Sequence, residues 1–110
     1  MDEKAPRVMR EVKMVINVEV RFLGIFQRLS GKKRFKLKLE EPATVRKVVM
    51  KLTKTFSSEY KQVLVDSQID DPRPNALILV GGKEISALQG LETLVKDGEK
   101  IVLVPLVHGG

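Results

Sequence analysis

The residues best suited to chemistry stand at the carboxyl end of the sequence, which reads Val107-His108-Gly109-Gly110. Glycine adds nothing to a hydrophobic core and loses more backbone entropy on ordering than any other residue. A chain without Cβ atoms is thin, however, and can enter a narrow cleft that leads to a catalyst. We therefore expect His108 and Gly109 to form a reactive tail that presents the α-carboxylate of Gly110 to another protein.

The sequence does not indicate a catalytic site of its own. It has one histidine and no cysteine, a composition that leaves no thiolate nucleophile, Ser-His-Asp arrangement or Cys-based metal site to be proposed. The pair Gly81-Gly82 lacks the spacing of a phosphate-binding loop and the Lys-Ser/Thr that follows one. We expect a protein without enzyme activity, bound cofactor or metal, in which His108 either tunes the charge of the tail near neutral pH or is an exposed linker residue.

Length and composition predict one ordinary soluble domain. The chain has 110 residues, of which 43% are hydrophobic and 31% charged, values typical of a single globular domain. No apolar run approaches the ~20 residues that span a bilayer. Residues 1–6 lack the apolar segment of a signal peptide. We expect a cytoplasmic protein that makes no membrane contact.

The net charge of +6 is locally concentrated. Such a charge favours contact with an acidic protein surface or with nucleic acid. Only 5% of the residues are aromatic and none is tryptophan, whereas single-strand binders offer rings on which bases stack. A basic docking face is the favoured interpretation, and an RNA-binding module is kept as an alternative. The cluster consists of Arg28, Lys32, Lys33, Arg34, Lys36 and Lys38.

Hydrophobic periodicity predicts the order of the elements. Residues 14–22 and 32–40 alternate apolar and polar side chains, which indicates two half-buried strands in an antiparallel hairpin. We interpret the connection 23–31 as a loop with one apolar turn. Thr44 is a plausible N-cap for a helix, whose apolar stripe follows the spacing i, i+3, i+4, i+7, i+11. The stripe is Val45, Val48, Val49, Leu52 and Phe56.

The second half of the chain supplies the remaining strands. Residues 57–74 are ambiguous between helix and strand and end in a loop. Residues 76–80 form an apolar strand that turns at Gly81-Gly82 into a short return strand. Residues 101–107 are almost continuously apolar, which is typical of a strand paired on both edges. This last strand therefore belongs in the middle of the sheet.

These elements predict an α+β domain with a mixed sheet of four to five strands wrapped on one main helix. We expect a mobile N-terminal tail over residues 1–13, the domain over 14–107 and the reactive tail over 108–110. The expected core is Ile16, Val18, Val20, Phe35, Leu37, Val45, Val48, Val49, Leu52, Leu77, Leu79, Ile101 and Leu103.

Three stretches carry a resemblance to a known family: residues 18–33, residues 77–85, and residues 90–98 running on to the terminal Gly-Gly. The chain resembles the ubiquitin-like β-grasp fold and, more narrowly, its sulfur-carrier branch. That branch includes the small subunit of molybdopterin synthase, the thiazole sulfur carrier, the ubiquitin-related modifier of tRNA thiolation and the archaeal small modifiers. Residues 57–74 look longer than in the molybdopterin subunit, and His108 looks more like the ubiquitin-related modifier.

The resemblance implies a chemistry for Gly110. A ubiquitin-activating-type enzyme would use ATP to adenylate the carboxylate, and sulfur transfer would then give a thiocarboxylate. The sulfur would pass to a molybdopterin precursor on the molybdopterin synthase large subunit, or to tRNA through a tRNA thiolase. Alternatively, lysines of target proteins would attack the activated carbonyl and form isopeptide bonds. A subunit that serves only as a scaffold is a further alternative, although it gives no reason for a terminal Gly-Gly.

Period two in the last strand predicts a docking face. If Ile101 and Leu103 face the helix, Val102 and Val104 lie on the opposite face of the sheet. We expect that face to be shared with Arg34, Lys36 and Lys38, which makes a patch for a partner with an apolar centre and an acidic rim. The resemblance implies that this face meets the activating enzyme.

Overall fold

The computed structural model describes residues 14–106, so the predicted tail 1–13 and the residues Val107, His108, Gly109 and Gly110 lie outside the described residues. Five strands and three helices make up the described part, together with two short 3₁₀ turns at Ile85–Ala87 and Gly90–Glu92. In chain order, the helices and strands are β1 (Val15–Phe22), α2 (Gly24–Ser30), β2 (Arg34–Glu40), α3 (Val45–Thr55), α4 (Ser58–Leu64), β3 (Ala76–Val80), β4 (Lys83–Glu84) and β5 (Lys100–Pro105).

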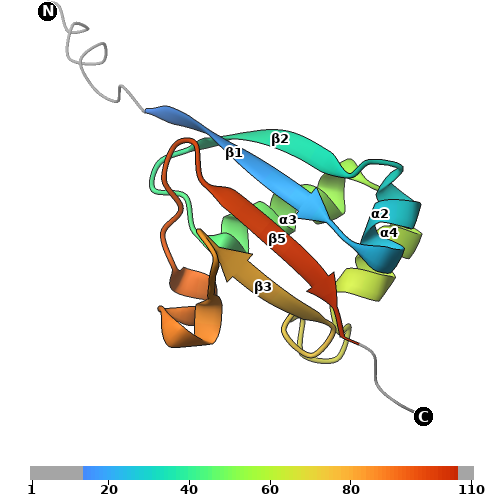
Figure 1. Cartoon of the computed structure of the whole chain (residues 1–110). Coiled ribbons are helices and arrows are strands. Elements are labelled where there is room, and N and C mark those ends of the chain that lie inside the picture. The colour runs from blue at the N-terminus through green and yellow to red at the C-terminus, as the bar shows by residue number, and fades with distance from the viewer. Residues whose placement is uncertain (1–13, 107–110) are drawn as a thin grey trace, which may run out of the picture.

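The strands form one mixed sheet in the order β2-β1-β5-β3-β4 (Figure 1). β1 and β2 are antiparallel, as are β3 and β4, whereas β5 runs parallel to β1 and antiparallel to β3. The prediction that the last strand lies in the middle of the sheet is confirmed. Because both of its edges are paired, β5 fixes how the two halves of the sheet are placed relative to each other.

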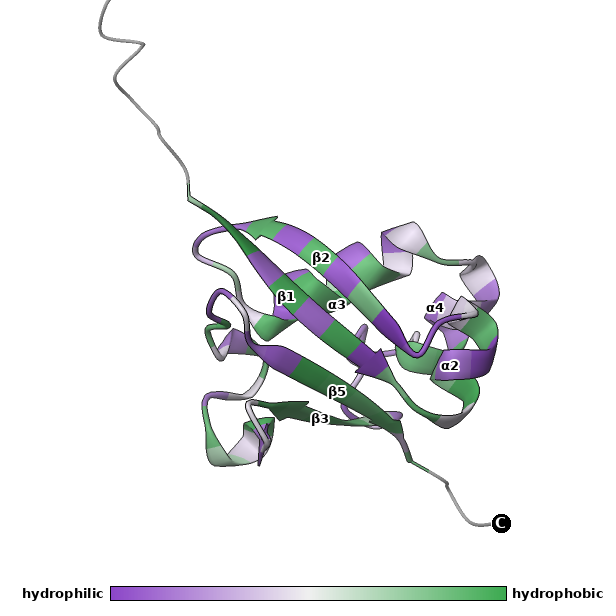
Figure 2. Cartoon of the chain, turned by 45° about the horizontal axis from the view of Figure 1, so that its top comes forward, coloured by the Kyte–Doolittle hydropathy of each residue, from purple (hydrophilic) through white to green (hydrophobic). Residues whose placement is uncertain are grey.

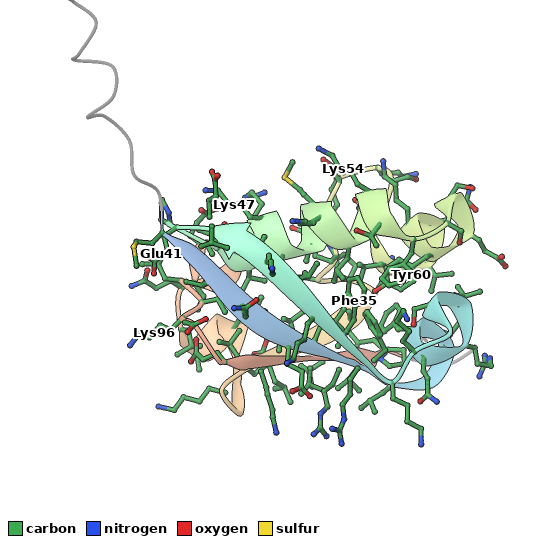
Figure 3. The ribbon with its side chains drawn as sticks, turned by 90° about the horizontal axis from the view of Figure 1, so that it is seen from above. Phe35, Glu41, Lys47, Lys54, Tyr60 and Lys96 are labelled. Atoms are coloured by element: carbon green, nitrogen blue, oxygen red, sulfur yellow. The ribbon has the colours of Figure 1, made fainter. Side chains whose placement is uncertain are left out.

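Helix α3 covers the inner face of the sheet, and Figure 1 shows it behind β1 and β5. The helix begins at the predicted cap, where the Thr44 hydroxyl accepts a hydrogen bond from the backbone N–H of Lys47 at 3.2 Å. Four residues of its apolar stripe are buried, and Leu52 is 0% exposed. In Figure 3, Lys47 and Lys54 lie on the side of α3 away from the sheet. The predicted sheet wrapped on one main helix is therefore confirmed as a β-grasp arrangement.

The interpretation of residues 23–31 as a loop is wrong, because residues 24–30 form the helix α2. Gly24 has a φ of +54° and no side chain caps the start of the helix, so the usual sequence signal of a helix start is absent. Burial of Phe26, which is 0% exposed, stabilises this short helix against the core. The helix ends at Ser30, and the following Gly31 has a φ of +75°, which is typical of the residue after a helix C-terminus.

The ambiguous segment resolves as helix α4 followed by a loop. Ser57 caps the helix by accepting a hydrogen bond from the N–H of Tyr60 at 3.1 Å. The ring of Tyr60 packs edge-on against Phe22, with centroids 5.8 Å apart, and Figure 3 shows it between the helices and the sheet. Burial raises the pKa of the Tyr60 phenol because it disfavours the phenolate. Among residues 14–106 the longest helix is α3 with 11 residues, and none has the length and hydropathy to cross a bilayer.

Most of the predicted core is buried as expected, but the assignment of β3 is wrong. Leu77 and Leu79 are only partly buried and face outward, whereas Ala76, Ile78 and Val80 are 3%, 1% and 5% exposed. Every residue of this strand is apolar, so period two alone gave no reason to prefer one face. The register with β5 decides, because Ile78 pairs with the buried Leu103 and paired residues share a face. Phe35, also predicted in the core, is partly buried against it.

This register makes a prediction about two neighbouring residues of one strand. We expect Ile78→Ala to lower the free energy of unfolding by about 2–5 kcal/mol, because it leaves a cavity in the core. Leu79→Ala should lower it by less than half as much, because that side chain is partly solvated in the folded state. Urea denaturation of both variants measures the difference. Equal losses, or a larger loss for Leu79→Ala, would contradict the register.

Candidate functional site

The candidate site consists of the end of β5 and the outer face of the sheet around it. The predicted reactive residues His108, Gly109 and Gly110 lie outside the described residues. The structure does describe their base, since β5 ends at Pro105 and Leu106 follows it. The geometry of that base and of the neighbouring surface determines from where the tail departs.

Four apolar side chains occupy the outer face of β5 and β3, and we call them the outer sheet patch: Leu77, Leu79, Val102 and Val104. Val102 pairs with Leu79 and Val104 pairs with Leu77, so each pair lies side by side on one face. All four are partly exposed. Figure 2 shows the apolar character of β5 and β3 beside the alternating polarity of β1 and β2. The patch is therefore an apolar surface directly before the tail.

Basic residues border this patch on the β1 and β2 side. Arg34 pairs with Arg21, which in turn pairs with Val102, so one row crosses the sheet from the edge to the patch. Glu19 lies between the two arginines, with its Oε2 3.2 Å from Nε of Arg21 and 3.9 Å from Nε of Arg34. These contacts align the guanidinium groups on the outer face. Lys36 and Lys38 are exposed further along β2.

The predicted placement of the docking residues agrees with this geometry. Val102 and Val104 lie opposite Ile101 and Leu103, which are both 0% exposed. Arg34, Lys36 and Lys38 pair with outward-facing residues of β1 and share the face of the two valines. Sequence reasoning placed Leu77 and Leu79 in the core and so missed them here, although they add two apolar side chains to the two valines. The only sequence signal for these two leucines was the apolar segment 76–80, which could pair with the last strand. Docking itself stays a prediction.

The end of β5 is held from two sides. On one side, the N–H of Leu106 donates a hydrogen bond to the carbonyl of Asn75, at 3.0 Å. On the other, Pro105 lies against Gly24 at the start of α2, where a Cβ atom would stand only 2.8 Å from Cγ of the proline. Sequence reasoning missed Gly24, Asn75 and Pro105, because contacts between distant segments leave no periodic signal.

The loop that carries Asn75 is shaped by an ion pair. Arg73 donates from Nη2 to Oδ2 of Asp71 at 2.6 Å and from Nε to Oδ1 at 3.0 Å. The hydrogen bonds from this guanidinium are the main cause that lowers the pKa of Asp71, and the same bonds raise the pKa of Arg73. The N–H of Asn75 then donates to the carbonyl of Pro72 at 2.9 Å. The loop therefore presents the Asn75 carbonyl in a defined position.

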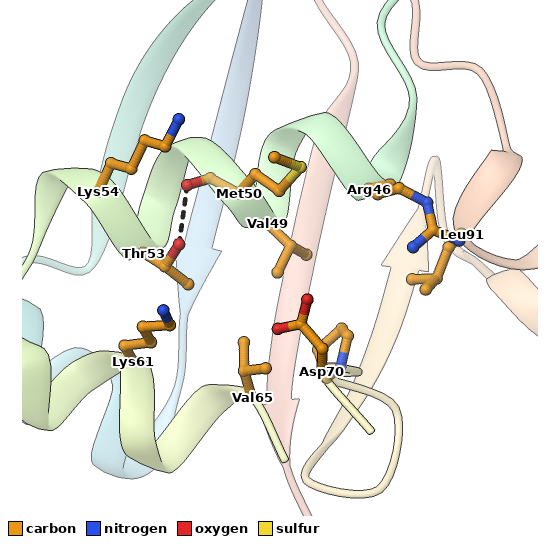
Figure 4. Close-up of a pocket in the computed structure, with 10 residues that line it drawn as sticks. Arg46, Val49, Met50, Thr53, Lys54, Lys61, Val65, Asp70 and Leu91 are labelled. Carbon is orange, nitrogen blue, oxygen red and sulfur yellow. Dashed lines mark hydrogen bonds between the residues drawn. The ribbon is translucent and has the colours of Figure 1, made fainter. Parts of the chain in front are cut away.

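A separate cleft lies on the helix side, between α3, α4 and the loop before β3 (Figure 4). Its volume is about 240 Å³, and Met50 in its wall is 50% exposed. Figure 4 shows Val49 and Asp70 facing each other across it. Of the predicted site residues that the structure describes, none lines this cleft, and the cleft is distinct from the outer sheet patch. Its lining is Arg46, Val49, Met50, Thr53, Lys54, Lys61, Val65, Asp70, Pro72 and Leu91.

Within residues 14–106, no group of three or more His, Cys, Asp or Glu side chains is arranged to hold a metal ion. The described site thus consists of a buried central strand, an apolar patch with a basic border, and a fixed base for the tail. Together with the β-grasp arrangement, the mixed sheet with its central last strand is that of a ubiquitin-like domain.

Comparison with known proteins defines the family. Residues 20–110 match the ThiS family, and the chain belongs to it. Small archaeal modifier protein 3 of Haloferax volcanii is 26% identical over 95 residues, which cover 86% of this chain and 100% of the relative. Ubiquitin-related modifier 1 of Saccharomyces cerevisiae is 26% identical over 99 residues, covering 87% and 100%.

A solved structure shows the same architecture. The solution structure of small archaeal modifier protein 1 from Methanosarcina acetivorans superposes with a TM-score of 0.69. Its sequence is 26% identical, and the alignment covers 88% of this chain and 99% of that one. The sulfur-carrier and modifier resemblance predicted from the sequence is confirmed at the level of the family and the fold.

Proposed function

We propose that this chain is a sulfur carrier of the cytoplasm, whose Gly110 carboxylate is adenylated by a ubiquitin-activating-type enzyme and then converted to a thiocarboxylate for molybdopterin or tRNA thiolation. The observation that carries the proposal is that the ThiS match continues through residue 110 and so includes Gly109 and Gly110. The outer sheet patch supports it, because a docking surface on β5 is continuous with the base of the tail.

The chemistry begins with a poor electrophile, since a carboxylate resists attack by nucleophiles. A carboxylate oxygen of Gly110 attacks the α-phosphorus of ATP, pyrophosphate leaves, and the product is an acyl-adenylate. A hydrosulfide equivalent then attacks the carbonyl carbon, the bond to AMP breaks, and a thiocarboxylate remains. Side chains at Gly109 or Gly110 would obstruct both approaches. In this scheme ATP is bound by the partner, and the chain is a co-substrate without a catalytic site of its own.

The alternative function is that of a protein modifier. A lysine amine would attack the same acyl-adenylate, lose a proton and displace AMP, which leaves an isopeptide bond to Gly110. The observation that favours this alternative is that both curated relatives are named as modifiers. The two functions share the activation step and differ only in the nucleophile that follows it.

The intact mass of the protein purified from its host tests the proposal. A sulfur carrier should show a population heavier by the difference between one sulfur and one oxygen atom. A modifier should instead show a ladder of much heavier protein adducts, each with a branched peptide that ends at Gly110. The matched control is a chain without Gly109 and Gly110, which should show neither species. A single unmodified mass for the native chain would contradict both functions.

A second prediction concerns the outer sheet patch. Val104→Asp should weaken binding to the adenylating enzyme roughly tenfold or more, equivalent to about 1.4 kcal/mol, because a carboxylate would be buried in an apolar interface. Isothermal titration calorimetry measures the affinity, and thermal denaturation verifies the fold. Met50→Asp adds the same charge at a half-exposed site on α3 and should bind like the wild type. Equal affinities of the two variants would remove the patch from the interface.

A further inference from the structure

The contact between Gly24 and Pro105 joins the start of α2 to the end of β5. Gly24 has a φ of +54°, a conformation that glycine adopts far more readily than other residues. A Cβ atom at this position would lie 2.8 Å from Cγ and 3.6 Å from Cδ of Pro105. The proline ring therefore occupies the space that a side chain at residue 24 would need.

The chain is also fixed on the side of β3. Pro105 pairs with Ala76 at the end of the ladder between β5 and β3, and the Leu106 N–H donates to the Asn75 carbonyl at 3.0 Å. Proline fixes φ near −65° and so restricts the backbone at this point further. Two residues earlier in β5, and on the side of β1, the Leu23 N–H donates to the Leu103 carbonyl at 3.3 Å. Segments on both sides of β5 thus hold its last residues.

We propose that Gly24, Pro105 and Asn75 form a clamp that sets the direction in which the chain leaves the sheet, so that the Gly110 carboxylate reaches the catalytic centre of the adenylating enzyme. These are positioning residues, and their role rests on the proposed function. We call the three residues the tail clamp.

The position of the base matters because the tail that follows it is short. The four residues after Leu106 can span about 14 Å when extended, at roughly 3.5 Å per residue. The position of this base therefore limits the points that the Gly110 carboxylate can reach. Misplacement of a reacting group by about 1 Å can already cost a hundredfold in rate. The outer sheet patch thus binds the adenylating enzyme, and the tail clamp positions the Gly110 carboxylate.

The test compares two glycine-to-alanine variants, one at the first residue of α2 and one at the residue directly after the helix. Gly24 and Gly31 both have positive φ, at +54° and +75°, but nothing lies within 4 Å of a Cβ atom at Gly31. Both variants therefore carry a backbone strain of about 1–2 kcal/mol, and only Gly24→Ala displaces Pro105. ATP–pyrophosphate exchange by the host's adenylating enzyme gives kcat and KM for each. We expect kcat to fall about tenfold or more for Gly24→Ala with KM unchanged, and neither to change for Gly31→Ala.

A second variant keeps the test decisive if Gly24→Ala does not fold. Pro105→Gly removes the ring and the restriction on φ without strain at residue 24, and it should show the same fall in kcat. Amide hydrogen exchange of Leu106 reports the clamp without the enzyme, because its N–H bonds to Asn75. In both variants this amide should lose protection while the amides of β1 keep theirs.

The outcomes separate the clamp from the function on which it rests. If the wild type supports exchange and Gly24→Ala matches Gly31→Ala in both kcat and KM, the clamp is overturned and the proposed function stands. If the wild type supports no exchange, the proposed function fails. In that case the hydrogen exchange of the Leu106 amide still tests the clamp. Unchanged protection of this amide in Gly24→Ala and Pro105→Gly would overturn the clamp.

Discussion

The structure depends on the burial of β5 between two neighbouring strands. Ile101 and Leu103 are both 0% exposed, and they join the core under α3 while β1 and β3 take up the hydrogen bonds of both edges. A central strand of this kind cannot move without breaking both ladders. Because side chains alternate along a strand, the same burial fixes which residues of β5 face outward. One constraint therefore sets the core, the outer sheet patch and the origin of the tail.

This arrangement separates stability from function along a single strand. The inward residues of β5 hold the domain together, whereas the outward Val102 and Val104 are available to a partner. The following residues leave the sheet at a base held by segments from both sides, through Gly24 and Asn75. The proposed function requires this combination, since the folded domain has to dock on the partner while the residues after it reach the partner's active site. The helix-side cleft lies away from this surface.

The sequence was sufficient to predict elements whose pattern has a single solution. β1 and β2 alternate polar and apolar residues, so their inward faces follow directly, and the stripe of α3 allows one orientation only. β3 carries apolar residues on both faces, and only its pairing with β5 shows that Ile78 and not Leu79 belongs to the core. The helix α2 was missed because it starts at Gly24 without a capping side chain and is stabilised by tertiary burial of Phe26.

Some residues of the candidate site could also be predicted from the sequence, and others could not. Val102, Val104 and the basic residues of β2 could be assigned to one face because period two is a local rule. The tail clamp could not be found from the sequence, because a close approach between Gly24 and Pro105 depends on the packing of α2 against the end of β5. A glycine before an apolar turn looks the same whether or not a proline ring lies over it.

In the proposed function, the terminal glycines carry the activated group and the folded domain delivers it to the enzyme. ATP–pyrophosphate exchange, catalysed by the adenylating enzyme of the host, tests this claim when the full chain is compared with a chain lacking Gly109 and Gly110. We expect exchange with the full chain and none with the shortened chain, although the shortened chain should fold and bind the enzyme with the same affinity. Exchange at the wild-type rate with the shortened chain would contradict it.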